Sequence, residues 1–463
     1  MSKKNANITQ QLLLIAVAVA LTFSAPARAM TLAEAVAYAM DHNRDVLAVE
    51  EQIIERKGQV TEARADALPQ LDLIVTGLRM RDPGFLNSNF GQSILKGEGG
   101  GGDDFPIPIE AIMPKPQTFY ETSLAFSQPL FTWGKVTSAV RLAKLGIEEV
   151  GALLEATRQE VAFRVTSAYY DVLLAEETVA VYEKSIEVQR RYLKQTRDFI
   201  EVGDATRLDL LRAESQLAAT KPELLQARHN VVQARKNLNF LLGRPLDTEI
   251  HTAPVKEPGE PEAPGLESVI SEAVSRRPDL RQLKLQVEMY GKTISVFKAD
   301  FRPKVDLVGA YGFSTIDTDN QFDRDYESWR VALQVSIPVF DGFRNRGIVG
   351  QYRSRQVQKQ IETEKLAEQV RLDARQSLDA LDAAVEVFRA RRIALASAEE
   401  QERVTAETYQ QDLATSFELL DSNQKAIQAR TEFLMAHYNL LLRIAALKKI
   451  KGTPVDKLFS PNS

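Results

Sequence analysis

The sequence predicts a mainly α-helical protein with four β-strands per chain, built as two copies of one unit. Three observations predict this class. The segment 32–73 recurs without a gap as the segment 266–307, two long stretches have the periodicity of coiled coils, and four shorter stretches alternate apolar with polar residues. An internal repeat of this length indicates two similar halves of one structure, although length alone suggests about three domains.

The repeat has two offsets. Pro69 aligns with Pro303, 234 residues later, whereas Ser127 aligns with Ser336, 209 residues later. The first copy therefore holds a longer insertion before Ser127. We expect a signal peptide at 1–29, a first repeat at 30–243, a Pro-rich linker on the outside at 244–265, a second repeat at 266–452 and a C-terminal tail at 453–463.

The N-terminus has the features of a secretory signal. Lys3 and Lys4 precede the apolar run 12–23, which is too short to span a bilayer, and Ala27 and Ala29 provide a small-residue cleavage site. Cleavage after Ala29 removes three basic and no acidic residues, so the net charge changes from −5 to −8. An acidic chain without a basic cluster argues against a nucleic-acid partner.

Residue types that usually carry chemistry are sparse. The chain has no cysteine, which excludes disulfides, thiolate metal sites and a lipidated N-terminal cysteine. Its four histidines form no ligand-spaced cluster, and serine, histidine and aspartate occur in no recognised catalytic motif. We therefore expect no enzyme activity, no cofactor and no metal site.

The first helix of each repeat ends at a proline. A helix is expected over 31–67, beginning at a capping box of Thr31 and Glu34 and ending before Pro69. Its counterpart in the second repeat ends before Pro303.

Each repeat also contains a long helical hairpin. The stretch 135–200 lacks proline, and one helix of this length would be on the order of 100 Å long. After a break at 202–206 the chain returns as an antiparallel partner, which Gly243 ends. The second hairpin turns near 412–415.

Four stretches have the period of two that is typical of strands. They are 71–75, 120–127, 305–313 and 329–337. Each strand is expected to run for about 10 residues, enough to cross a bilayer at a tilt. A half-buried sheet of a soluble protein shows the same alternation, so the pattern alone leaves both interpretations open. The segment 81–117, rich in glycine and proline, is expected as a long surface loop.

An acidic pair follows the second hairpin turn. Glu418 and Asp421 lie three residues apart and therefore share one helix face. Asp209 is the first-repeat counterpart of Glu418, but Arg212 replaces the second acid. Without further information, these acids are equally well explained as part of a solvated helix surface.

These features together resemble the TolC-like outer membrane efflux family over essentially the whole mature chain. The resemblance is carried by the paired helices that end at Pro69 and Pro303, the strand ends 128–131 and 337–340, and the sequence 241–243. It implies a trimer in which three chains share a 12-stranded membrane barrel, with a long α-helical tunnel in the periplasm. Four strands cannot close a barrel by themselves, and open strand edges are not tolerated in lipid.

The resemblance also implies a function, partners and sites. The expected function is a passive outer membrane channel of a tripartite efflux or type I secretion system in a Gram-negative bacterium. The expected partners are two further copies of the chain, outer membrane lipid, a periplasmic adaptor and, through the adaptor, an inner membrane pump. A soluble periplasmic coiled-coil scaffold or adaptor is the alternative.

Three groups of residues follow from this family assignment. The tunnel constriction would comprise Glu418, Asp421 and Asp209. The adaptor-contacting tips would comprise Val202, Gly203, Asp204, Ala205, Thr206, Leu413, Ala414 and Thr415. The lipid-facing strand residues would comprise Trp329, Val331, Leu333, Val335 and Ile337. Asp204 and Gln411-Asp412 depart from the Val-Gly-Leu type of turn that is usual at the family's tips.

Overall fold

The computed structural model describes residues 29–80, 116–255, 264–316, 319, 322–411 and 413–455. The predicted signal peptide up to residue 28, the greater part of the loop 81–117, Asp412 and the end of the tail lie outside the described residues. The chain divides into two compact units, and each takes residues from both predicted repeats. The sheet unit comprises Glu55–Ile147 and Gln286–Lys359, and the helical unit comprises the remainder.

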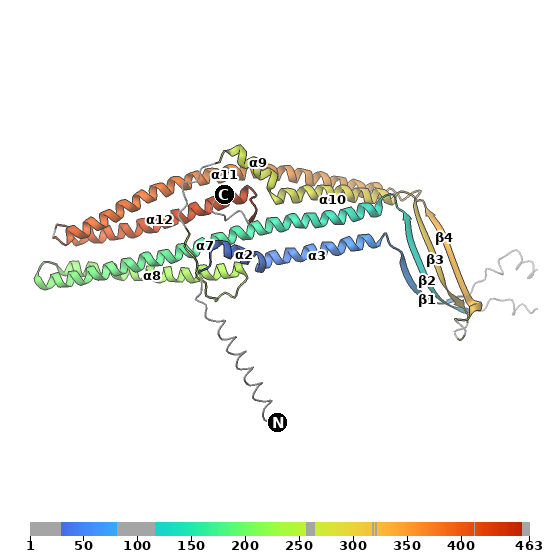
Figure 1. The fold of residues 1–463 in the computed structure, drawn as a ribbon, viewed down its shortest axis with the longest axis horizontal. Coiled ribbons are helices and arrows are strands. Elements are labelled where there is room, and N and C mark those ends of the chain that lie inside the picture. Colours follow the sequence, from blue (N-terminus) through green and yellow to red (C-terminus); the bar gives the residue numbers. More distant parts are fainter. Residues whose placement is uncertain are drawn as a thin grey trace, which may run out of the picture. The chain divides into compact units, whose positions relative to one another are not determined.

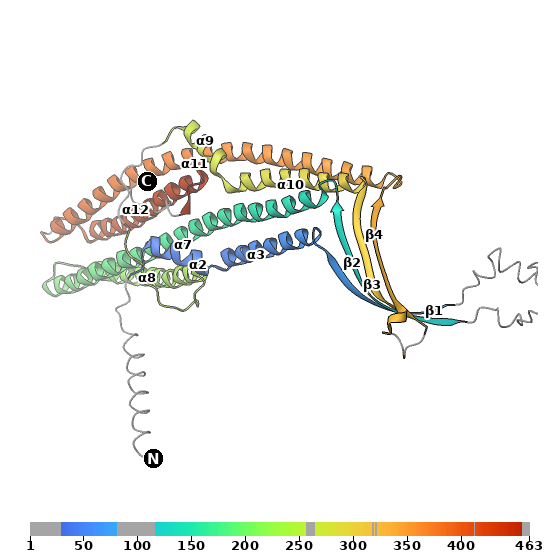
Figure 2. The same ribbon diagram turned by 45° about the vertical axis from the view of Figure 1, so that its right-hand side comes forward.

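The four predicted strands are all present in the sheet unit. They are β1 (Gln70–Met80), β2 (Gln117–Phe131), β3 (Lys304–Thr315) and β4 (Glu327–Ser336). Each strand is antiparallel to the next in the order β1-β2-β3-β4, and Figure 2 shows them as one curved sheet. Strands β1 and β4 form the two edges, and each pairs on one side only among the described strands.

The strand register places the predicted apolar side chains on one face of the sheet. Leu73 lies opposite Leu124, Leu124 opposite Tyr311, and Tyr311 opposite Trp329. Successive side chains along a strand point to opposite faces of the sheet. Every second residue, counted along each strand from these four, therefore lies on the same face as they do. The predicted lipid-facing residues Trp329, Val331, Leu333, Val335 and Ile337 are between 56% and 74% exposed, and Ile337 lies one residue beyond β4. A continuous apolar surface of this kind marks an interaction surface.

Two tight turns connect strands to long helices, and both have unusual backbone conformations. Trp133 and Gly134 lie between β2 and the helix that begins at Lys135, with φ of 51° and 78°. Gly342 and Phe343 lie between β4 and the helix that begins at Arg344, with φ of 67° and 65°. Left-handed backbone is favourable only for glycine, and a side chain there costs roughly 1–2 kcal/mol. Each turn therefore holds one aromatic residue in a strained position.

Two helical hairpins dominate the helical unit, as predicted. Helix α7 (Lys135–Val202) is followed by α8 (Arg207–Leu242), and α11 (Arg344–Tyr409) by α12 (Ser416–Ile450) (Figure 1). The first turns of α7 and α11 belong to the sheet unit. Helices in the described part of the chain lack the combination of length and apolar character that a membrane crossing requires.

The first helix of each repeat is interrupted, which the sequence analysis did not predict. Helices α2 (Leu32–His42) and α3 (Arg44–Ala65) are separated at Asn43. In the second repeat, α9 (Leu266–Arg276) and α10 (Pro278–Asp300) are separated at Arg277, 234 residues later. The Asn43 side chain donates a hydrogen bond of 2.7 Å to the Leu241 carbonyl and accepts one of 2.9 Å from the Asp45 amide. This tertiary contact stabilises the non-helical backbone.

Part of the linker 244–265 packs into the helical unit, although it was expected on the outside. Ile250 is 3% exposed and belongs to the largest core cluster, and Met30 pairs with Thr252 in a short parallel bridge. The Tyr169 hydroxyl lies 2.7 Å from the Ala253 carbonyl and 2.8 Å from that of Met30. Burial raises the pKa of Tyr169 to about 12, so it stays neutral. The linker therefore closes the core beside α7.

Candidate functional site

The predicted hairpin tips are built on two equivalent capping boxes. Helix α8 begins at Thr206, whose amide donates to Asp209 over 3.0 Å while the Asp209 amide donates to the Thr206 hydroxyl over 3.3 Å. Helix α12 begins at Thr415, whose amide donates to Glu418 over 2.7 Å while the Glu418 amide donates to the Thr415 hydroxyl over 3.3 Å. These bonds satisfy amides that a helix end otherwise leaves unpaired.

A direct hydrogen bond joins the two tips. The hydroxyl of Ser416, the first residue of α12, donates to the carboxylate of Asp209 in the first turn of α8. This bond is the main reason that the pKa of Asp209 lies below its usual value, and the bond from the Thr206 side chain adds to the effect. Asp209 is therefore a charged residue that links the hairpins.

The other two predicted constriction residues also have partners. The amide and the hydroxyl of Thr415 hold the pKa of Glu418 below its usual value, so Glu418 stays ionised as a cap residue. The Asp421 carboxylate lies 2.7 Å from the ammonium of Lys425, one turn along α12. All three acids lie near helix N-termini, and each has its own partner within the described chain.

The predicted adaptor-contacting residues lie at the ends of the hairpins. Val202 and Leu413 are 69% and 75% exposed, and Gly203 has a φ of 93° that suits glycine. Ala205 and Ala414 are half-buried, and Thr206 and Thr415 serve as helix caps. Asp204, the residue that departs from the family pattern, is exposed. Among the predicted residues, each tip thus presents one large apolar side chain to solvent, and Leu208 and Phe417 in the first turns of α8 and α12 are exposed as well.

Behind the tips, an apolar cluster connects the hairpins. The rings of Tyr192 from α7 and Tyr409 from α11 pack edge to face with centroids 5.4 Å apart, and Phe199 lies 6.1 Å from Tyr409. Ala213 from α8 is buried in the same cluster. Burial is the largest cause that raises the pKa of Tyr409, so it stays neutral. A groove of about 490 Å³ lies beside this cluster between α7, α11 and α12.

A polar network follows the aromatic cluster along the hairpins. The Gln189 amide donates to Asn423 over 3.1 Å, which links α7 to α12. Asn423 in turn donates to Glu402 on α11 over 2.7 Å, and Glu402 also accepts from Arg430 over 2.7 Å. Gln189 and Asn423 are both buried, so this network fixes how the hairpins pack together.

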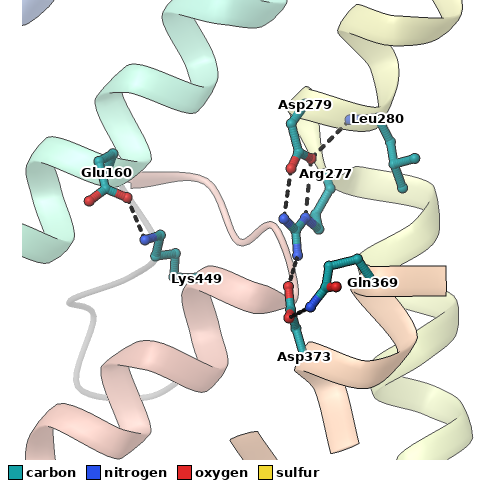
Figure 3. Close-up of polar contacts among 7 residues, drawn as sticks. All are labelled: Glu160, Arg277, Asp279, Leu280, Gln369, Asp373 and Lys449. Carbon is teal, nitrogen blue, oxygen red and sulfur yellow. Dashed lines mark hydrogen bonds and ion pairs between the residues drawn. The ribbon is translucent and has the colours of Figure 1, made fainter. Parts of the chain in front are cut away.

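A separate ion cluster holds the break between α9 and α10 (Figure 3). The Arg277 guanidinium lies 2.6 Å from Asp279 and 3.2 Å from Asp373 on α11. Gln369 donates a further hydrogen bond of 2.8 Å to Asp373. Lys449 and Glu160, also drawn in Figure 3, form an ion pair of 2.5 Å that connects α12 with α7. These contacts are structural, because the carboxylates that surround Arg277 already satisfy its charge.

Sequence reasoning missed the tip caps, although their signal was present. The pattern of threonine followed three residues later by an acid identified the cap at Thr31, which the structure confirms. The same pattern occurs at Thr206 and at Thr415. It indicates that Asp209 and Glu418 have a capping role in addition to any role in the tunnel.

Comparison with known proteins supports one family. The family model described as outer membrane efflux protein matches residues 36–244 and 269–453. Alkaline protease secretion protein AprF from Pseudomonas aeruginosa is 23% identical over 72% of this chain and 69% of its own. Outer membrane protein TolC from Vibrio cholerae is 21% identical over 73% of this chain and 78% of its own.

A solved structure shows the same fold. The outer membrane channel CmeC from Campylobacter jejuni superposes with a TM-score of 0.76 at 17% identity, over 91% of this chain and 85% of that one. The four-stranded sheet and the long helical hairpins of this chain therefore have the same fold as that structure. The chain belongs to the outer membrane efflux protein family. Its location in the outer membrane and its role in export follow from this membership, which favours a channel over a soluble scaffold.

Proposed function

We propose that three copies of this chain form an export channel, with one twelve-stranded barrel in the outer membrane and one helical tunnel in the periplasm. The observation that carries this proposal is the sheet. It has an exposed apolar face, and its edges, β1 and β4, each pair on one side only among the described strands. Backbone amides and carbonyls at an edge require partners in lipid, and an antiparallel sheet meets that requirement only by closing. Three sheets of four strands supply the twelve strands that the family resemblance implies.

Cysteine cross-linking tests this arrangement directly, because the chain contains no cysteine of its own. Three double variants combine Val75→Cys on β1 with one cysteine on β4, which is Trp329→Cys, Val331→Cys or Leu333→Cys. Oxidation in the membrane is expected to produce covalent dimers and trimers from at least one pair. The single variants are the controls, because a lone cysteine cannot join β1 to β4. A stable monomer in mild detergent, with full sheet content and without cross-links, would overturn the proposal.

The tips are proposed to bind a periplasmic adaptor that connects the channel to an inner membrane pump. The exposed Val202 and Leu413 provide apolar contacts at the ends of the hairpins, and the groove beside Tyr192 and Tyr409 provides a concave surface between them. Val202→Asp with Leu413→Asp is expected to abolish export while the trimer stays in the outer membrane. Phe240→Asp, at an exposed position of α8, is the matched control. Unchanged export by the tip variant would show that the adaptor binds elsewhere.

The constriction is proposed to be acidic. Glu418 and Asp421 share a helix face, and a trimer would hold six such carboxylates around its axis. Crowded carboxylates attract cations, so the entrance is expected to favour them. The proposed role is electrostatic, and the capping bonds of Glu418 are compatible with it because they keep the carboxylate ionised.

A further inference from the structure

We propose that the region where the strands meet the helices binds the headgroups of anionic phospholipids. This strand–helix corner comprises residues 131–136, 297–304 and 337–346, all within the sheet unit. Its parts are in contact. The Lys135 ammonium lies 2.7 Å from the Asp300 carboxylate, and the Asn345 side chain donates to the Phe297 carbonyl over 2.5 Å. The inference rests on the proposed insertion of the sheet into the outer membrane.

The corner presents two pairs of aromatic rings to solvent. Phe131 and Trp133 pack edge to face with centroids 5.0 Å apart, and Phe340 and Phe343 do the same at 5.6 Å. Phe131 and Phe340 are equivalent positions of the repeat. All four side chains are between 45% and 72% exposed, so burial within the chain does not explain them. Exposed aromatic pairs at both turns of the corner indicate a partner outside the chain.

The backbone supports the same conclusion. The two turns place Trp133 and Phe343 in left-handed conformations, which disfavour any residue with a side chain. Trp133 aligns with Gly342, and Gly134 aligns with Phe343, so each repeat places its aromatic at the position where the other has glycine. Glycine at both positions would remove the strain. Strained residues of this kind mark functional positions, and here the strain directs a ring to the surface.

The charge at the corner is opposite to that of the whole chain. The three segments carry six basic and two acidic side chains, whereas the whole chain has a net charge of −5. The Lys304 ammonium lies 3.3 Å from the Asp300 carboxylate, which is thus paired with both Lys304 and Lys135. Arg302, Arg344 and Arg346 make no ion pair with any described residue. The Arg302 guanidinium instead lies over the Trp133 ring, 5.2 Å from its centroid.

Aromatic rings with free guanidinium groups fit one chemical environment. Tryptophan and other aromatics favour the level of the headgroups, where the ring is half in the apolar layer and half in water. Arginine at that level binds phosphate through paired hydrogen bonds. The corner lies at the end of the apolar sheet face, so the two groups would meet the phosphates of the adjacent leaflet. A neighbouring copy of the chain is the competing occupant.

Fluorescence can distinguish these occupants, because the chain contains only two tryptophans, Trp133 at the corner and Trp329 in β4. Trp329→Phe and Trp133→Phe each leave one fluorophore in the full mature chain. Both variants are placed in vesicles of phosphatidylcholine and phosphatidylglycerol that carry a nitroxide near the headgroup or deep in the acyl chain. Trp133 is expected to be quenched most strongly by the shallow label, and Trp329 by at least one of the labels.

The outcomes separate the two proposals. If lipid labels do not quench Trp329, the proposed membrane insertion is wrong. If they quench Trp329 but not Trp133, insertion stands and the corner proposal fails. In that case, protection of Trp133 from iodide in water identifies a neighbouring protein surface, and access to iodide identifies an unoccupied corner.

The proposed role of the three arginines is tested by measuring how strongly the protein retains anionic over zwitterionic phospholipid. The triple variant Arg302→Gln, Arg344→Gln, Arg346→Gln is compared with wild type in mixed nanodiscs by native mass spectrometry. Each arginine is expected to contribute on the order of fivefold to the retention of phosphatidylglycerol over phosphatidylcholine, less at high salt. The control replaces three exposed arginines of the helical unit, Arg190, Arg371 and Arg375, by glutamine. Equal retention by the triple variant and the control, or displacement of the lipid by millimolar inorganic phosphate, would overturn a headgroup site.

Discussion

The hydroxyl of Ser416 donates a hydrogen bond to the carboxylate of Asp209, and this single bond joins the N-terminus of α12 to that of α8. A carboxylate is favoured at this place because both helix N-termini carry partial positive charge. The same carboxylate also caps α8 through Thr206. Asp209 therefore stabilises both tips, and its loss would affect two hairpins together.

Ser416→Ala is expected to loosen the tips by about 1 kcal/mol, because a hydrogen bond to a charged group is lost. Hydrogen exchange of the amides at the start of α12 would measure this change, with Ser397→Ala, an exposed position of α11, as the control. The pKa of Asp209 is lowered in the folded state, so its contribution is complete above the ordinary aspartate pKa of about 4 and is lost as the pH falls through the lowered value. The difference between the variant and wild type should therefore shrink only in acid. An undiminished difference at low pH would contradict this role for the charge.

Gly243 is expected to tolerate no side chain. It ends α8 with a φ of 73°, and a Cβ there would lie 2.4 Å from the His42 carbonyl oxygen. Gly243→Ala is therefore expected to destabilise the protein by about 2 kcal/mol or more, since strain and a backbone clash add together. Gly350→Ala, inside α11 with open space around it, should instead stabilise slightly. Denaturant midpoints of the two variants should move in opposite directions, and a shared direction would refute the argument.

The ion cluster at the α9–α10 break is expected to contribute to stability more than a surface pair. Arg277 is only 18% exposed, so Asp373→Asn leaves a mostly buried guanidinium with one carboxylate fewer. A loss of about 1–2 kcal/mol is expected, compared with less than about 0.5 kcal/mol for Arg191→Gln, which breaks an exposed pair. Thermal unfolding of both variants would measure the difference. Equal shifts would mean that Arg277 needs only Asp279.

The strands and hairpins could be predicted because their signals are local. Apolar and polar residues alternate over 329–337, where the structure has β4. The stretch 135–200 lacks proline, and the structure has α7 there. The alternation also predicted which side chains of each strand lie on the apolar face of the sheet, because the same pattern sets the strand register.

The interruptions and the bond between the tips could not be predicted in the same way. Asn43 ends α2 with the help of the Leu241 carbonyl, 198 residues away, and Ser416 reaches Asp209 across 207 residues. Such contacts depend on packing that one sequence does not display. The break at Arg277 is different, because Pro278 disfavours helical backbone at the residue before it and provided a local signal.

The charge of the proposed constriction can be removed without disturbing the helix cap. Glu418→Ala would remove a capping bond together with the charge, so glutamine is the better replacement. Glu418→Gln keeps the geometry of a capping box and removes only the charge, and Asp421→Asn is its partner. In planar bilayers under a salt gradient, the double variant is expected to lose cation preference and to be blocked less by trivalent cations. Lys425, the partner of Asp421, is left unchanged in the double variant, so that the substitutions remove only negative charge.

The control must be an acidic pair without a structural role. Glu399 binds Arg430 over 2.9 Å and is therefore unsuitable. Glu364 and Glu368 are exposed on α11, so Glu364→Gln with Glu368→Gln removes the same charge at another place. The trimer and its thermal stability should survive in both double variants, because substitutions at exposed helix positions usually change stability by less than about 0.5 kcal/mol. If the control alters selectivity as strongly as the tip variant, the effect arises from the overall charge of the tunnel. If neither variant changes selectivity or block, Glu418 acts only as a helix cap and the constriction lies elsewhere.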